Sequence, residues 1–444
     1  MLKGEVRSLT GTHDVLWPES ERWERLISGF AQHVRSYGFR LLITPVIEET
    51  RLFSRGIGEE SDVVGKEMYV FQDRGGRSVT LRPEGTAPVV RSFIQHRPPV
   101  PWKVWYVTPA FRYERPQAGR YRQHHQLGVE VIGSSSPAVD VEVIECAVRF
   151  VEGLGITGTR LLLNSMGCRD CRPDYEEQLR NYLAALPGSA EAREEIGGAN
   201  ALCEYHAATY REAPLRVLDC KRESCRRSTG DAPRLAAGLC DACREHASFV
   251  TAGLDALGVN YERDHRLVRG FDYYTRTTFE FVSPALDAAQ DAIGGGGRYD
   301  GLSEILGGPA APSIGFGIGI ERLLLASDAG KGAGEGGGSD RIFVADLTAG
   351  SAQLTVASEL RRAGFSVDCS FEERSLKGLL RTADGLGAAA ALIIGRRELD
   401  DGTVTVKPLR GQGEQVTVPR GEMVAAIGRL VRAPVGRDAG PADS

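Results

Sequence analysis

The stretch FRYERPQAGRYRQHHQLGVE, residues 111–130, decides how the rest of this sequence is interpreted. An apolar run from Val104 to Phe111 precedes it and an apolar alternation from Leu127 to Ile132 follows, so the pattern predicts two strands joined by a long loop. Pro116 and Gly119 favour a turn within that loop. A solvated hairpin with surface arginines is the alternative for this segment alone. Guanidinium groups here suit phosphate or a polyanion: Arg112, Arg115, Arg120 and Arg122.

Length, composition and net charge limit the kinds of protein that this sequence can be. A chain of 444 residues with 42% hydrophobic content can hold roughly two or three globular domains. We find no apolar run of the ~18 residues that span a bilayer and no signal-peptide pattern, so we expect a cytoplasmic protein without a membrane partner. The net charge of −5 argues against a generally basic surface, so any nucleic acid must bind through local patches.

The first part of the chain predicts a helix, a strand that ends at Pro45, and a strand pair that turns at Gly75-Gly76. Their ranges are 18–37, 39–43, 67–71 and 78–82. Glu84 and Thr86 follow the last strand, where a carboxylate can accept a hydrogen bond from an ammonium group and a hydroxyl can assist. A surface turn is the alternative reading of that segment.

A module between residues 165 and 258 interrupts the chain after a predicted helix at 138–153 and a strand at 160–164. Seven of the nine cysteines lie in it, which indicates metal ligands or reduced structural thiols in a reducing compartment. Two tetrahedral zinc sites would need four couples of this spacing, and buried thiols without metal are the alternative. The couples are Cys168–Cys171, Cys203–His206, Cys220–Cys225 and Cys240–Cys243.

Two glycine-rich segments follow. Residues 293–301 are too rich in glycine for any regular element, and their backbone can approach a planar ligand or a phosphate closely. Residues 313–319 alternate glycine with bulky residues and predict a strand with one bare face. That strand leads into a helix with Arg322 in its first turn. A flat base can lie on a bare strand face, and a helix start favours anions.

The remaining sequence predicts a separate α/β domain. Residues 328–339 read as a flexible linker, and strands and helices alternate after it, at 341–347, 351–364, 365–370, 375–387 and 389–395, before a hairpin-like pair and a final helix to about 432. The predicted organisation is therefore a catalytic core at 1–164 and 259–327, an insertion at 165–258, the linker, an α/β domain at 340–434 and a disordered tail at 435–444.

Six segments together resemble the class II aminoacyl-tRNA synthetases, and specifically the histidyl-tRNA synthetase family. The helix, strand and Pro45 resemble the first class motif, residues 111–130 the second and GFGIGIERLLL (315–325) the third. LVRGFDYYTRTTFEF (267–281) and GGGGRYDGL (294–302) resemble the two histidine-specific motifs, and TLRPEGTAPVVR (80–91) also matches. The likeness covers nearly the whole chain in the expected order. No P-loop sequence occurs.

The resemblance implies an α+β catalytic domain on a mostly antiparallel sheet, with an inserted small domain and a C-terminal α/β domain that reads the anticodon. It implies ATP-dependent ligation of L-histidine to tRNA(His) through a histidyl-adenylate, with Mg²⁺, in a homodimer. One alternative is a catalytically inactive synthetase-like regulatory subunit of histidine biosynthesis, a class that generally lacks the C-terminal domain and the arginine-bearing histidine motif. A synthetase for another amino acid is disfavoured by Arg269-Gly270 with Tyr273-Tyr274.

The resemblance also implies residue roles. The catalytic groups at the α-phosphate are Arg112 and Arg269; those that bind ATP are Arg112, Glu114, His124 and Arg322; those around histidine are Glu84, Thr86, Gln126, Glu130, Arg269, Tyr273, Tyr274 and Tyr299; those facing the tRNA acceptor end are Arg115, Gln117, Arg120 and Arg122. Two positions depart from the family pattern. His124 replaces a phenylalanine that stacks on adenine, so nucleotide affinity is expected to differ or to vary with pH. His206 replaces a cysteine and leaves the zinc question open.

Overall fold

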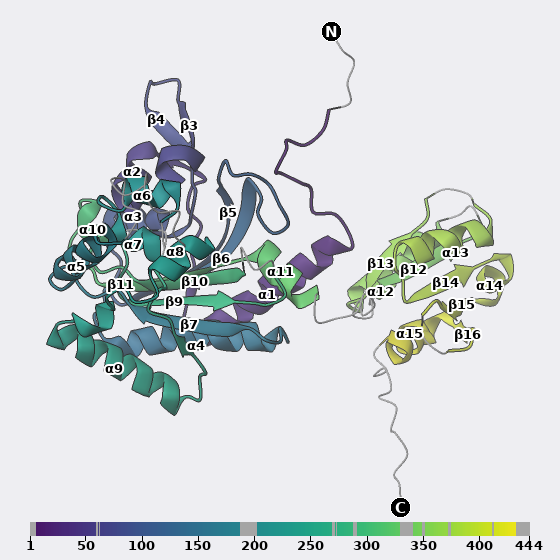
Figure 1. The fold of residues 1–444 in the computed structure, drawn as a ribbon. Coiled ribbons are helices and arrows are strands. Elements are labelled where there is room, and N and C mark those ends of the chain that lie inside the picture. Colours follow the sequence, from purple (N-terminus) through teal and green to yellow (C-terminus); the bar gives the residue numbers. More distant parts are fainter. Residues whose placement is uncertain are drawn as a thin grey trace, which may run out of the picture. The chain divides into compact units, whose positions relative to one another are not determined.

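The structure is a computed structural model. It describes residues 6–58, 61, 63–186, 202–268, 271, 273–286, 291–328, 341–348, 351–371, 374–410 and 413–431. The chain forms two compact units, Met1–Gly332 and Ala333–Ser444, whose elements are labelled in Figure 1. Among the described helices, none is long and apolar enough to cross a membrane.

An eight-stranded sheet is the centre of the first unit, with strand order β1-β5-β6-β11-β10-β9-β7-β8. Its inner pairs are antiparallel and only the two edge pairs, β1–β5 and β7–β8, are parallel. This confirms the mostly antiparallel sheet. The strands are β1 (Arg40–Leu41), β5 (Trp102–Phe111), β6 (Gln123–Ile132), β7 (Arg160–Ser165), β8 (Glu262–Arg263), β9 (Thr275–Val282), β10 (Ala292–Arg298) and β11 (Ser313–Gly319).

Four helices cover one face of this sheet and bury the largest core (Figure 1). They are α1 (Glu19–Ser36), α4 (Pro137–Gly153), α9 (Asp241–Ala256) and α11 (Ile320–Asp328). Helix α1 begins directly after Pro18 and presents Trp23, Leu26, Phe30 and Val34 to the core, because residues three and four apart share one helix face. The helix predicted at 18–37 is confirmed.

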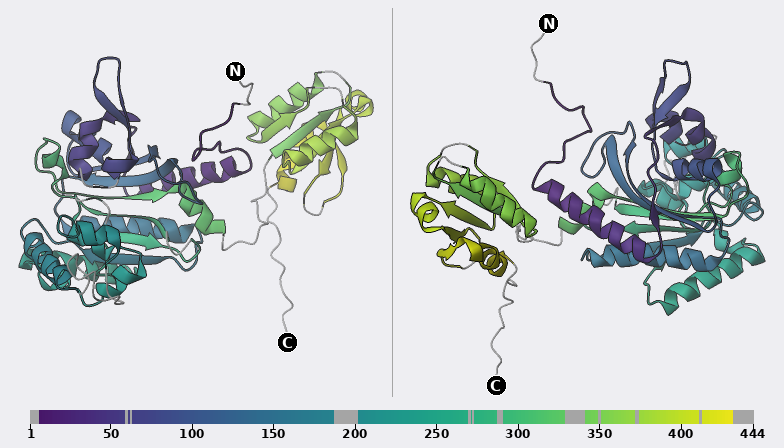
Figure 2. Two further views of the ribbon diagram at one scale, coloured as in Figure 1. Left: turned by 45° about the horizontal axis from the view of Figure 1, so that its top comes forward. Right: turned by 180° about the vertical axis from the view of Figure 1, so that it is seen from behind.

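The opposite face carries α2 (Thr50–Ile57), a π-helical turn (Val63–Glu67), α3 (Thr86–His96), α10 (Leu302–Ile305) and a small sheet. That sheet has the order β2-β4-β3, with β2 at Ile47–Glu49, β3 at Tyr69–Gln72 and β4 at Ser78–Leu81. The predicted strand pair at Gly75-Gly76 is confirmed, and Figure 2 shows this hairpin projecting from the unit. Glu84 follows the end of β4, as predicted, and the segment that contains it leads into α3.

The inserted module has a small helical core of its own, built around Tyr175, Leu179, Val217 and Leu235. Its helices are α5 (Arg172–Ala184), α6 (Glu204–Thr209), α7 (Pro214–Leu218), α8 (Glu223–Ser228) and a 3₁₀ turn (Leu235–Ala237). The module leaves from β7 and the chain returns to β9, which pairs directly with β7. Helix α9 lies within the predicted bounds of the insertion, 165–258, but its residues Val250 and Leu254 pack into the main core. The separate core of the module therefore ends at the start of α9.

The expectation that residues 293–301 form no regular element is wrong, because 292–298 form β10. This strand pairs with β9 on one side and β11 on the other, so two hydrogen-bonded ladders outweigh the low strand preference of glycine. Glycine is required there for a steric reason as well. A Cβ on Gly296 would lie 2.0 Å from the carbonyl oxygen of Gly315, and one on Gly294 would lie 2.6 Å from that of Gly317.

The second unit is a five-stranded sheet, with order β13-β12-β14-β15-β16 and helices on both faces. This confirms the α/β domain, with one short helix, α14, that the sequence did not predict. The linker after residue 328 and the tail at 435–444 lie outside the described residues. The elements are β12 (Arg341–Asp346), α12 (Ala352–Arg362), β13 (Ser366–Cys369), α13 (Leu376–Gly385), β14 (Ala390–Ile394), α14 (Arg396–Asp401), β15 (Thr403–Pro408), β16 (Val416–Pro419) and α15 (Met423–Val431).

Replacing Gly296 by alanine should lower the free energy of unfolding by more than about 2 kcal/mol, because the new methyl group has no room between two strands. Gly317→Ala is the matched control, since nothing lies within 4 Å of a Cβ at that glycine. Urea unfolding of both variants tests this. Equal loss of stability in the two variants would contradict the packing explanation.

Candidate active site

The floor of the site is one face of β6 and β11. Gln126 lies opposite Gly319 and Gly128 lies opposite Gly317. Because side chains alternate along a strand, His124, Gln126 and the glycines share this face, while Leu127 and Val129 enter the core. The face is bare at Gly317, where nothing lies within 4 Å of a would-be Cβ.

A cavity lies above this floor, and most of the residues predicted for the site line it. They come from distant parts of the chain: the segment before α3, the β5–β6 loop, β6, the segment before β9, and α11. The predicted residues on its wall are Glu84, Thr86, Arg112, Glu114, Arg120, His124, Gln126, Tyr273, Tyr274 and Arg322. Glu130 and Tyr299 lie behind the wall, and Arg269 lies outside the described residues.

Three guanidinium groups line the cavity: those of Arg112, Arg120 and Arg322. Arg112 follows β5, and its Nε donates to the carbonyl of Pro83 at 3.0 Å. Arg322, in the first turn of α11, donates from Nε to the carbonyl of Gly119 at 3.1 Å. Burial lowers the pKa of Arg322, and the nearby cations Arg120 and Arg112 lower it further. Arginines whose charges repel across a cavity favour the binding of an anion between them.

Glu114 partly offsets this charge. Its carboxylate pairs with Arg120 and lies 3.9 Å from a terminal nitrogen of Arg112. The Glu114 carboxylate thereby holds two of the arginines in place. The arrangement suits a polyphosphate.

His124 is a neutral ring in this cavity. Burial lowers its pKa to about 3, and the adjacent charges of Arg112, His125 and Arg322 act in the same direction. The imidazole can therefore offer an uncharged flat face to a base. Because the proton is lost far below neutral pH, pH-dependent nucleotide binding is not expected from this residue, contrary to the sequence-based expectation.

Glu84 is buried and caps helix α3. Its carboxylate accepts hydrogen bonds from the backbone N–H of Thr86 at 2.5 Å and of Ala87 at 2.7 Å. These are two of the N–H groups that a helix start leaves without intrahelical partners. Glu84 is therefore fixed by the backbone while it still contributes to the cavity wall.

Glu130 is fully buried behind the wall. Its carboxyl group accepts from the hydroxyls of Thr86 at 2.8 Å, Tyr106 at 3.2 Å and Tyr299 at 2.5 Å. Burial raises the pKa of Glu130 to about 8, although these hydroxyls act in the opposite direction. Gly315 makes room for the group, because a Cβ there would lie 1.6 Å from a Glu130 oxygen.

Several wall residues were not predicted. Tyr106 lies directly opposite Gly128 on β6, and its ring occupies the space that a Cβ on Gly128 would need. Glu321 accepts from the backbone N–H of His125 at 3.0 Å. A tyrosine in a predicted strand, opposite a glycine of the next strand, is a sequence signal that could have identified Tyr106. The module residues Asp219 and Lys221 also line the wall, but no sequence pattern indicates them.

The predicted acceptor-end residues do not behave as one group. Arg115 and Gln117 are exposed on the β5–β6 loop, whereas Arg120 lines the cavity. Arg122 lies over the ring of Tyr113, 3.9 Å from its centroid, and contacts the carbonyl of Thr10 at 3.4 Å. The first two are free to meet a partner, and Arg122 has an internal packing role.

Glu130 should make stability depend on pH. The folded state keeps this proton up to about pH 8, whereas the unfolded chain loses it near pH 4.5, so the free energy of unfolding should fall between these values by up to about 1 kcal/mol per pH unit. Glu130→Gln cannot titrate and should remove that part of the slope. Denaturant unfolding at pH 5, 6, 7 and 8 measures it. An identical slope in both proteins would rule out the assigned pKa.

Comparison with known proteins supports a single family. A family model described as histidyl-tRNA synthetase matches residues 11–323, and one described as anticodon binding domain matches residues 346–430. The chain is 43% identical over 434 residues to the histidine–tRNA ligase of Halothermothrix orenii, which covers 96% of this chain and 100% of that one. It is 47% identical to that of Rhodococcus erythropolis, covering 95% and 97% of the two chains.

Comparison with solved structures supports the same family. The apo histidyl-tRNA synthetase of S. aureus superposes with a TM-score of 0.75 at 33% identity, covering 95% of this chain and 100% of that one. A protein of Bacillus halodurans C described as an ATP phosphoribosyltransferase regulatory subunit/histidyl-tRNA synthetase gives a TM-score of 0.62 at 18% identity, over 88% and 98% of the chains. At that identity the second likeness shows the fold alone.

Proposed function

The chain belongs to the histidyl-tRNA synthetase family, and we propose on that premise that it ligates L-histidine to tRNA(His), using ATP and releasing AMP and pyrophosphate. The reaction passes through a histidyl-adenylate. The observation that carries the proposal is the gathering of Arg112, Arg120 and Arg322 around a strand face left bare by glycine. That arrangement suits a nucleotide triphosphate whose base and phosphates need different surroundings.

The nucleotide half of the site follows from this geometry. The neutral ring of His124 stacks on the adenine, and the open floor at Gly317 admits the flat part of the molecule. Arg322 holds the γ-phosphate end, with Glu114 near the nucleotide. Mg²⁺, which the family uses with ATP, supplies further charge neutralisation at the phosphates, and the wall carboxylates Glu280 and Asp291 are oxygen donors of the kind it takes.

The chemical step needs charge stabilisation more than acid–base catalysis. The carboxylate of histidine is already a nucleophile, so no protein base is required. Its attack on the α-phosphate develops negative charge on the phosphoryl oxygens, which preorganised guanidiniums stabilise. We assign this role to Arg112 and Arg269.

Selection of histidine is assigned to the side of the cavity near Glu130. A histidine ring offers two nitrogens, and discrimination requires partners for both. We propose that Glu130 and the tyrosines recognise the two ring nitrogens. The Glu130 carboxyl group accepts hydrogen bonds from the hydroxyls of Thr86 and Tyr106, which line the cavity. The ratio of kcat/KM for histidine to that for an analogue without the ring N–H can then reach about 10⁴, because the analogue would leave a buried polar group unpaired. Glu84, Gln126, Tyr273 and Tyr274 complete the pocket.

The tRNA is assigned to two separate surfaces. Arg115 and Gln117 on the exposed loop meet the acceptor end, beside Arg120 and Arg122. The unit at 340–434 reads the anticodon, where unpaired bases are recognised by stacking and by hydrogen bonds to their edges. The match of residues 346–430 to an anticodon binding domain supports this assignment.

We further propose that the chain acts as a cytoplasmic homodimer. Leu41, Ile43 and Ile47 around the first motif are exposed at 49%, 82% and 51%, beside the edge strand β1, and exposed apolar groups of this kind mark interfaces. All nine cysteines are free, which fits a reducing compartment. Ile43 is the most exposed of the three, so a charge there should separate the subunits: Ile43→Asp is expected to sediment as a monomer, and an unaltered dimer would refute this interface.

The alternative function is a catalytically inactive regulatory subunit of histidine biosynthesis. The likeness to the protein of Bacillus halodurans C shows that the fold does not decide between the two. The C-terminal unit and the sequence Arg269-Gly270 favour the ligase, because such regulators generally lack both. A regulator would bind histidine without consuming ATP.

Histidine-dependent ATP–pyrophosphate exchange on purified full-length protein tests the ligase directly. Exchange should require histidine, and Arg269→Ala should reduce its rate about 100-fold or more, as expected for a lost transition-state donor. Arg115→Ala is the matched control: it should exchange normally but charge tRNA(His) more slowly, because Arg115 is exposed away from the cavity wall. Folded wild-type protein without exchange would remove the proposal, and normal exchange in Arg269→Ala would remove that residue's role.

A further inference from the structure

We propose that the inserted module binds two structural zinc ions, one at Cys168, Cys171, Cys240 and Cys243 and the other at Cys203, His206, Cys220 and Cys225. In each group the four ligand atoms lie within 4.8 Å of one another. The two sets have the Cys₄ and Cys₃His compositions of closed structural zinc sites. The inference goes beyond the proposed ligase activity, which needs neither ion for its chemistry.

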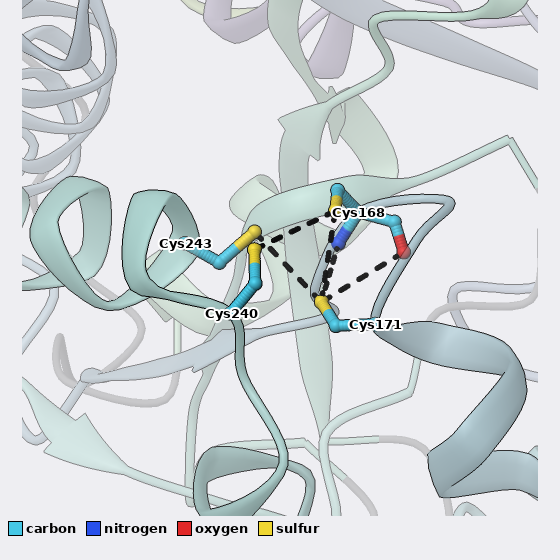
Figure 3. Close-up of side chains that lie close together, drawn as sticks. All are labelled: Cys168, Cys171, Cys240 and Cys243. Carbon is cyan, nitrogen blue, oxygen red and sulfur yellow. Dashed lines mark hydrogen bonds between the residues drawn. The ribbon is translucent and has the colours of Figure 1, made fainter.

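The first site has the dimensions of a tetrahedral thiolate site. A Zn–S bond of about 2.3 Å with tetrahedral angles separates ligand sulfurs by about 3.8 Å. The Sγ of Cys168 lies 3.7 Å from that of Cys171 and 3.8 Å from that of Cys240, and Cys171 and Cys243 lie 3.9 Å apart. Disulfides need about 2.05 Å. Figure 3 shows the four thiols pointing toward a common centre.

Its position explains what the first ion would do. Cys168 and Cys171 follow β7, whereas Cys240 and Cys243 lie at the start of α9. The ion would therefore fasten the two ends of the module, 72 residues apart, at the edge of the catalytic unit. A cross-link of that span stabilises mainly by restricting the unfolded chain.

The second site mixes sulfur and nitrogen at comparable distances. The Nδ1 of His206 lies 3.2 Å from the Sγ of Cys203 and 3.8 Å from that of Cys225, around the value of about 3.6 Å that Zn–S and Zn–N bonds imply. The backbone N–H of Cys203 points at the Cys225 sulfur at 3.1 Å, and that of Cys168 points at the Cys171 sulfur at 3.2 Å.

The second site also adjoins the cavity. Cys220 lies between Asp219 and Lys221, both of which line the cavity wall, and the ammonium group of Lys221 lies 3.4 Å from a carboxylate oxygen of Asp291. An ion held by Cys220 would fix this segment and so present Lys221 to the bound nucleotide. Cys220 and its partners are thus positioning residues, with no contact to the reacting atoms.

Metal analysis of the full-length protein, purified under reducing conditions without chelator and without a metal-binding tag, tests both sites. The wild type should carry about two zinc ions per chain. Cys240→Ser and His206→Ala should each carry about one, while His206→Cys and the control Cys369→Ser should keep two. Because a variant can fail to fold, zinc release from the wild type by a mercurial thiol reagent is followed in parallel, and release of two ions supports the same conclusion.

The outcomes that overturn the proposal are distinct. Metal content below about 0.2 per chain, iron in place of zinc, or unchanged zinc in both site variants would reject it. Histidine-dependent exchange on the same preparations separates this result from the ligase proposal, since active protein without zinc would reject only the ions. His206→Ala should raise the KM for ATP at least about threefold and His206→Cys should not; equal KM values would reject the link to the cavity.

Discussion

The contact between the Glu130 carboxyl group and Gly315 is the constraint on which the site depends. A carboxyl group fits inside this sheet only because the neighbouring strand lacks a side chain at that point. The same relation recurs where the ring of Tyr106 lies against Gly128. On this side of the sheet glycine therefore occupies positions 315, 317 and 319 of β11 and position 128 of β6, while the other faces of the two strands carry the bulky residues of the core. The alternation of side chains along β6 and β11 thus places the floor of the cavity on one face of the sheet and the stabilising core on the other.

The arginines of the site are held in place mainly by backbone carbonyl groups. Arg322 reaches the cavity past Gly319, and its guanidinium is held by backbone carbonyl groups of the β5–β6 loop and of β10. Arg112 is held by the carbonyl of Pro83. Neutral carbonyl partners fix the direction of a guanidinium without cancelling its charge, so these arginines remain able to attract phosphate. Glu114 is a carboxylate partner that offsets part of the charge.

Much of this could be predicted from the sequence, and the exceptions have physical reasons. The period of apolar residues in α1 and the alternation in β6 are local signals, and both elements were predicted, although β6 begins at Gln123, before the predicted alternation from Leu127. The strand β10 was not, because its stability comes from two neighbouring ladders that local preference cannot reveal. For the site, the resemblance grouped residues that the fold does bring to one cavity, among them Arg112 and Arg322. It could not show that Glu130 lies behind the wall, or that Lys221 of the module reaches it.

The junction of the module with the sheet has a consequence for how the chain can be shortened. Since β7 and β9 are hydrogen-bonded neighbours, the sheet places no demand on the length of the segment between them. Helix α9 is different, because Val250 and Leu254 fill the main core although they follow the module in sequence. A minimal catalytic unit must accordingly be trimmed ahead of Asp241. A deletion that removed α9 as well would expose part of the main core, on the face of the sheet that α1, α4 and α11 also cover, to water.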